Sequence, residues 1–292
     1  MSLSIILNSN NVATNGTKSQ FTYNFINGSL NIPENSLMCV SNVTLPYSWF
    51  NVNSSQYNNN VFQYTFPTST GQQTFTVTLP NGYYAANDIN TYLQTKMIEN
   101  KQYLVNSAGE YVYYITLQYD VNYYAVQLMC FALPTSLPSG YTNPANMTFP
   151  STPSTPQIII SSTNNFGSLI GFNAGTYPST VQTTNQSFTS NSVPDGSPVN
   201  ALIMRCNLID NNVVMPSDIM DSIPISNVPF GSNLTYQPPF PKWVKMKAGR
   251  YSYMTVQLVD QNLNTIVATD PNVCITLLLM LGTSTVAPYT KR

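Results

Sequence analysis

The chain has 292 residues, of which only 7% are charged, and its formal net charge is −1. Globular proteins average about 25% charged residues, so uncharged polar side chains must cover most of this surface. The nearly neutral balance gives no overall attraction to nucleic acid, and the abundant aromatic and β-branched residues exclude a disordered chain. The length suits one large domain or two small ones, and we expect a single domain over residues 1–292.

Several kinds of chemistry are excluded by missing residue types. The chain contains no histidine, which removes Ser-His-Asp and Cys-His catalysis and almost every zinc site. No glycine-rich phosphate-binding motif occurs. The cysteines stand singly in apolar runs, which predicts buried, reduced thiols at Cys39, Cys130, Cys206 and Cys274. The first residues lack the basic region of a signal peptide, so we expect a chain that is not secreted.

The first third of the chain predicts strands and one helix. Residues 1–19 are expected to form an arm or an edge strand. Residues 20–25 alternate with the period of two that is typical of strands, and a second strand is expected at 36–45. Residues 61–66 and 73–79 predict a hairpin. An aromatic corner at 46–50 and an Asn-rich loop at 51–60 separate the second and third of these strands.

A helix is predicted from Asn87 or Asp88 to about Glu99. Either of the first two residues is able to cap a helix, because a short side-chain oxygen reaches the unpaired amides of the first turn. Apolar residues recur at helical spacing and should face the sheet as core packing: Ile89, Tyr92, Leu93 and Met97.

The middle of the chain combines strands with long loops. Strands are expected at 111–119, 123–133, 157–161 and 199–208, with a helical turn at Leu169 and Ile170 closed by Gly171. The tyrosines of the first pair suggest either sugar stacking or sheet walls with their hydroxyls at the wet rim, and we favour the walls. Loops are expected at 134–157, 179–197 and 209–241, of which the first and last are candidate insertions.

The C-terminal part predicts the centre of a sheet. A strand with two different faces is expected over 251–259, followed by a turn at 260–264 and a short strand at 265–268. Residues 273–281 are apolar on both faces, which suits a strand in the middle of a packed sandwich. About nine strands, one short helix and long loops together predict an all-β fold, an antiparallel β-sandwich of jelly-roll type.

Charged residues offer two candidate sites. The carboxylates closest together in the sequence are Asp210, Asp218 and Asp221. They could form a glycosidase pair or a Ca²⁺ site, but roles in helix caps, turns and solvated loops explain them better. Basic residues gather in the last fifth of the chain: residues 1–241 carry a net −5 and residues 242–292 a net +4. Within nine residues lie Lys242, Lys245, Lys247 and Arg250. This basic group is a candidate contact for the genome or for an acidic neighbour, or else a solvated strand edge.

The order of segments resembles the penton (minor capsid) proteins of virophages and Polinton-like viruses. Four stretches carry the resemblance: 20–25 with 43–51, then 75–84 running into the helix, then 169–178, and finally 199–212 with 256–279. The resemblance implies a single jelly-roll capsid protein without enzyme activity or cofactor. It also implies a homopentamer at the five-fold vertices of the virion, surrounded by a double-jelly-roll major capsid protein.

Two other functions stay open at the level of sequence. One is a lectin-like or receptor-binding module of a virion, which would bind a glycan. The other is a carbohydrate-active enzyme on a β-sandwich, which would need two of the aspartates. The resemblance favours the capsid role, with a location in the virion, weak contact with packaged DNA through the basic group and no membrane span.

Overall fold

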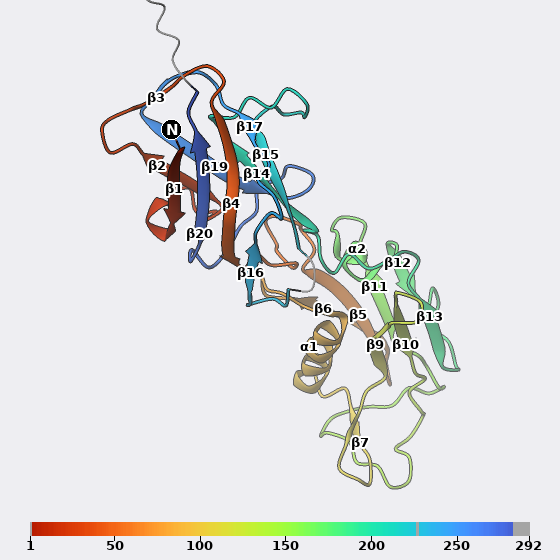
Figure 1. Ribbon diagram of the computed structural model, residues 1–292. Coiled ribbons are helices and arrows are strands. Elements are labelled where there is room, and N and C mark those ends of the chain that lie inside the picture. The colour runs from red at the N-terminus through yellow and green to blue at the C-terminus, as the bar shows by residue number, and fades with distance from the viewer. Residues whose placement is uncertain (1, 226–227, 283–292) are drawn as a thin grey trace, which may run out of the picture. The chain divides into compact units, whose positions relative to one another are not determined.

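The computed structural model of the chain describes residues 2–225 and 228–282 (Figure 1). It forms two compact units, the first made of residues 1–49 and 199–292 and the second of residues 50–198. The second unit is therefore inserted in the sequence of the first. The single domain expected over 1–292 stays a prediction.

The first unit contains a five-stranded and a four-stranded antiparallel sheet. One has the order β1 (Ser2–Asn8), β20 (Cys274–Met280), β4 (Leu37–Pro46) and β16 (Asn233–Tyr236), and β17 (Val244–Lys245) also pairs with β4. The other has the order β15 (Ile219–Pro224), β14 (Ala201–Cys206), β19 (Tyr253–Val259) and β2 (Gln20–Asn24). A two-stranded ribbon joins β3 (Leu30–Ile32) to β18 (Gly249–Tyr251).

The strand order of this unit is that of a jelly roll. If the eight main strands are lettered B to I in chain order, as β1, β2, β4, β14, β15, β16, β19 and β20, the two sheets read B-I-D-G and C-H-E-F. Two interlocked Greek keys produce this order. The predicted all-β fold of jelly-roll type is confirmed, and the second unit enters the chain between strands D and E.

The core of the first unit follows from alternation along its strands. Met254, Val256 and Leu258 of β19 are buried, as the two-faced pattern predicts. The central strand β20 lies between β1 and β4, also as predicted. It is buried on one face only, however: Ile275, Leu277 and Leu279 point inward, whereas Cys274 and Met280 are exposed. The second face stays open because an antiparallel sheet needs cover on only one side.

The expected strand at 265–268 is absent. The carboxylate of Asp260 accepts hydrogen bonds from the backbone amides of Asn262 and Asn264 at 2.8 and 2.7 Å. This holds the predicted turn, and the chain beyond it makes only single bridges, Thr265 to Val259 and Ala268 to Trp49. The turn thus directs the following residues away from a continuous ladder.

The loop predicted at 209–241 contains two strands, so that prediction was wrong for this part of the chain. Met220 and Ile223 of β15 are buried, but Asp221 between them conceals the alternation in the sequence. Residues 226 and 227 of this segment lie outside the described part of the chain, as do Lys291 and Arg292 of the basic C-terminal region.

The second unit is also built from antiparallel sheets. One sheet has the order β12 (Gly175–Tyr177), β11 (Gln157–Ile160), β5 (Val61–Thr68) and β6 (Gly71–Thr78). Another has the order β13 (Gln186–Thr189), β10 (Ala125–Cys130) and β9 (Ile115–Asp120), and β7 (Leu104–Val105) pairs with β8 (Tyr111–Val112). The helices are α1 (Ala86–Glu99) and α2 (Phe166–Ile170). A short 3₁₀ helix, Ser9–Asn11, lies in the first unit.

Aromatic side chains and the inner face of α1 form the core of the second unit. The rings of Phe62 and Phe166 stack with their centroids 4.3 Å apart. Ile89, Leu93 and Met97 of α1 are fully buried in the same cluster, as the helical spacing predicts.

In the second unit the structure differs from two sequence predictions and confirms a third. Helix α1 begins after Ala85 rather than at Asn87 or Asp88, and the Asp88 carboxylate accepts the Ala85 amide at 2.8 Å from within the first turn. The loop expected at 179–197 contains β13, which the polar sequence of that strand conceals. The helical turn at 169–170 is confirmed as α2, and Gly171 closes it with a φ of 76°.

Candidate functional site

Asp218 and Asp221 are each held by partners of their own. The Asp218 carboxylate makes an ion pair with Arg205 at 2.9 Å. The nearly buried Asp221 carboxylate accepts hydrogen bonds from Lys242 Nζ at 2.8 Å and from the Tyr236 hydroxyl at 3.0 Å. Both carboxylates are engaged by basic or hydroxyl partners. No cluster of three or more histidine, cysteine, aspartate or glutamate residues suits a metal anywhere in the described part of the chain.

The basic group is divided among different structural roles. Lys242 pairs with Asp221, and this hydrogen bond is the main reason that the pKa of Lys242 is raised. Lys247 Nζ donates to the Asn207 carbonyl at 3.1 Å, and Arg250 Nε donates to the Ser29 hydroxyl at 2.6 Å. The exposed ammonium of Lys245 has no partner among the residues that the structure describes. Only part of the group is therefore free to meet another molecule.

Three loops of the first unit meet at one end of the jelly roll. The segment at 207–218 is bonded to the segment at 244–252, since the Lys247 amide donates to the Leu208 carbonyl at 2.8 Å. The segment at 244–252 is in turn bonded to residues 25–36, since the Met246 amide donates to the Ser36 carbonyl at 2.9 Å. We call residues 25–36, 207–218 and 244–252 the loop end.

The loop end carries large apolar side chains that are almost fully exposed. Ile26, Val213 and Met215 are 91%, 92% and 94% exposed. Val213, Val214 and Met215 are consecutive and all exposed, and exposed apolar residues that cluster are typical of surfaces that meet a partner. Residue-by-residue analysis of the sequence missed this surface. The run of Val213, Val214 and Met215 inside a polar loop was a signal in the sequence, but the exposure of these side chains required the fold.

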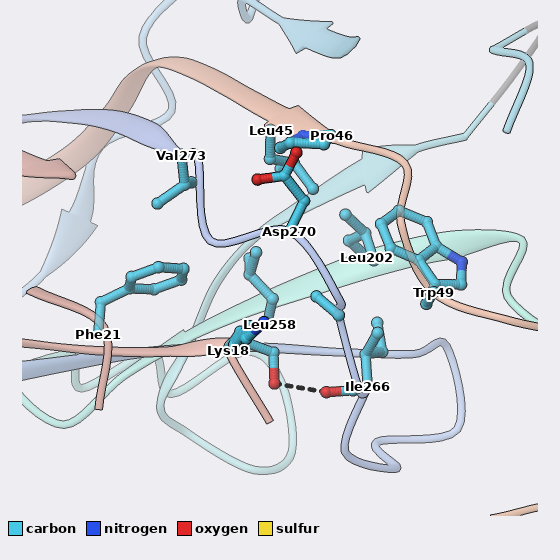
Figure 2. Close-up of a pocket in the computed structure, with 12 residues that line it drawn as sticks. Lys18, Phe21, Leu45, Pro46, Trp49, Leu202, Leu258, Ile266, Asp270 and Val273 are labelled. Atoms are coloured by element: carbon cyan, nitrogen blue, oxygen red, sulfur yellow. Dashed lines mark hydrogen bonds between the residues drawn. The ribbon is translucent and has the colours of Figure 1, made fainter. Parts of the chain in front are cut away.

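A small cavity lies in the first unit, lined by residues of both sheets (Figure 2). Leu45 of β4 and Leu258 of β19 line it together with Phe21 of β2. Its volume of about 20 Å³ holds roughly one water molecule. The indole nitrogen of Trp49 is buried beside it without a hydrogen-bond partner among the described residues. This space is too small for a substrate, and we interpret it as a packing gap.

The three buried cysteines are not activated as nucleophiles. Burial raises the pKa of Cys130 and of Cys206 to about 12, so both remain protonated thiols at neutral pH. Cys39 is also buried, and burial raises its pKa too. Cys274 is exposed, which corrects the prediction that all four are buried. It lies on the open face of β20, where the sheet has no second layer.

No helix in the described part of the chain is long and apolar enough to cross a membrane.

Comparisons with known proteins give structural matches only. No protein-family model and no curated protein matches the chain. The selenomethionine-labelled mavirus penton protein aligns with 97% of this chain and 99% of its own, at 8% identity and a TM-score of 0.45. A chain from the 3.5 Å cryo-EM structure of the Sputnik virophage aligns with 96% of this chain and 97% of its own, at 12% identity and a TM-score of 0.38. Both TM-scores lie below 0.5.

Proposed function

We propose that this protein is a structural capsid protein that forms the pentameric vertex of an icosahedral virion. The proposal is supported by the pairing of strands from the sequence stretches that resemble penton proteins. Residues 20–25 and 43–51 supply β2 and the end of β4, and residues 199–212 and 256–279 supply most of β14, β19 and β20. These strands pair directly as β2 with β19, β19 with β14 and β20 with β4. Jelly rolls of this topology are common in viral capsids.

The surface chemistry supports a role in assembly. Only 7% of the residues are charged, and the described residues form three ion pairs. Protein interfaces are depleted in charge at their centres, so a subunit with neighbours on several sides benefits from such a composition. A ring of five identical subunits needs two different complementary faces on each subunit, and the sheet faces and the loop end are available for this purpose.

The partners and location follow from the same proposal. The vertex ring contacts a double-jelly-roll major capsid protein, and we assign the exposed apolar tips of the loop end to contacts of this kind. Lys245 and the neighbouring basic residues face packaged DNA or an acidic capsid neighbour. The protein is made in the host cytoplasm and resides in the virion, and no catalytic step or cofactor belongs to this role.

The proposal is tested by the mass of the purified chain in light scattering. Five chains of 32.3 kDa amount to about 162 kDa, and we expect a species of that mass, alone or after the major capsid protein is added. A variant with Val213→Asp and Met215→Asp should weaken binding to the major capsid protein, because it places charge on the apolar tips. A stable trimer, or a chain that stays monomeric with the major capsid protein present, would refute the vertex role.

A further inference from the structure

The second unit contains an open cleft lined by tyrosines. It lies between the start of α1, the turn that joins β9 to β10, and residues 194–197. Its volume is about 330 Å³, within the range of small-molecule sites. Tyr83, Tyr84, Tyr119 and Tyr124 contribute to its lining, and no Asp, Glu, Lys or Arg does so. The cleft therefore suits a neutral ligand rather than an ion.

The cleft combines an apolar floor with free polar groups. Ile89 of α1 and Leu169 of α2 are buried and belong to the lining. The side-chain hydroxyls of Tyr84, Tyr119 and Tyr124 have no hydrogen-bond partner among the described residues. Burial also raises the pKa of Tyr84, which keeps its hydroxyl protonated and able to donate. Such a surface offers both ring faces for stacking and hydroxyls for hydrogen bonds.

One of these tyrosines, Tyr124, has an unusual backbone conformation. Tyr124 has a φ of 50°, in the left-handed region that bulky residues rarely adopt, and its side chain is 63% exposed. Its ring meets that of Tyr119 edge to face, with the centroids 6.2 Å apart. Strained residues of this kind are concentrated at functional sites. The adjacent Tyr123 is 75% exposed yet does not line the cleft.

We infer that this cleft binds a neutral carbohydrate. The apolar face of a pyranose ring stacks on tyrosine rings, and its hydroxyls exchange hydrogen bonds with the phenol groups, so the ligand matches both features of the lining. The absence of charged side chains from the lining disfavours sialylated or sulfated sugars. This inference concerns the second unit alone and does not depend on the assembly state of the first.

The test measures binding of neutral sugars to the full-length chain by saturation-transfer NMR. The probes are glucose, galactose, mannose and N-acetylglucosamine with their β-linked disaccharides. We expect at least one probe to bind with a Kd below about 20 mM, a weak affinity that suits an open cleft. Tyr124→Ala should weaken binding about tenfold, the effect of losing one aromatic stacking contact. Tyr124→Phe should weaken it less, because the ring remains.

Tyr123→Ala is the matched control, since it removes an adjacent and more exposed tyrosine from outside the cleft. Its binding should equal that of the unchanged chain, and circular dichroism should show that each variant is folded. The inference is wrong if no probe binds below about 20 mM, or if Tyr123→Ala and Tyr124→Ala have equal effects. It is also wrong if Tyr124→Ala changes the oligomeric mass and leaves sugar binding intact, because the cleft would then be a contact between subunits.

Discussion

The Asp221–Lys242 pair joins β15 to the segment between β16 and β17, and its loss should be measurable. Asp221 belongs to β15 of one sheet, and its hydroxyl partner Tyr236 belongs to β16 of the other. The Asp221 side chain is 4% exposed and that of Lys242 is 42% exposed. Lys242→Met would leave the carboxylate buried without a cation while keeping a long apolar side chain.

The size of the effect follows from this unequal burial. Breaking a fully buried pair typically costs about 3–5 kcal/mol. Water screens a lysine that is two-fifths exposed, and Asp221 keeps hydrogen bonds from Tyr236 and from the Ser222 amide. We therefore expect Lys242→Met to lower the free energy of unfolding by about 1–3 kcal/mol. The melting temperature of the first unit should fall by roughly 3–10 °C.

The assay is urea and thermal unfolding at pH 7, with Lys245→Met as the control. Lys245 belongs to the same segment and is exposed without a partner among the described residues, so its loss should change stability by less than about 0.5 kcal/mol. Equal stability of the two variants would refute the reasoning. A double-mutant cycle with Asp221→Asn isolates the pair, and strict additivity would likewise show that the two side chains are not coupled.

The pH dependence of the pair has a definite sign. The pKa of Lys242 is raised above 10.5, chiefly by the hydrogen bond to Asp221. A group with a raised pKa stabilises the fold fully below its unfolded value and loses this contribution as pH rises through the folded value. The stability difference between the unchanged chain and Lys242→Met should therefore be constant from neutral pH upward and shrink above pH 10.5. A difference that shrinks already between pH 7 and 9 would contradict this origin.

Two further predictions concern the cysteines and the basic group. At pH 8 an aromatic disulfide reagent should modify Cys274 rapidly in the native chain and the three buried thiols only after unfolding; rapid modification of two or more thiols would contradict the burial. If the basic group faces DNA, the double change Lys245→Gln and Lys247→Gln should reduce genome packaging, while the Lys242 ion pair stays in place. The control is Lys96→Gln with Lys101→Gln, which removes the same charge from the second unit. This control should leave genome packaging unchanged. Normal packaging by the first variant would count against the DNA contact.

The sequence predicted those strands that have a clear hydrophobic pattern within their own residues. Period-two alternation identified residues 20–25 and 251–259, and the apolar run at 273–281 identified the central strand of a sheet. Helical spacing identified the buried face of α1. In each case the pattern repeats within one segment, so local residues carry the whole signal. The strands β15, β16 and β13 were missed because a buried polar residue or a polar composition obscures their alternation, and pairing with distant strands stabilises them instead.

The sites required the tertiary structure, because each combines residues that are far apart in the chain. Asp221 looked like a member of an acidic cluster until the fold brought Lys242 and Tyr236 to its carboxylate. The segments at 207–218 and 25–36 are joined through the segment at 244–252 only because the chain returns along the jelly roll. The tyrosine cleft likewise combines residues 83–86 with 119–124 and 194–197. The sequence alone thus determined an all-β, charge-poor chain without histidine chemistry. Pairing between segments decided which side chains became neighbours, since the periodicity within one segment does not encode its contacts with another.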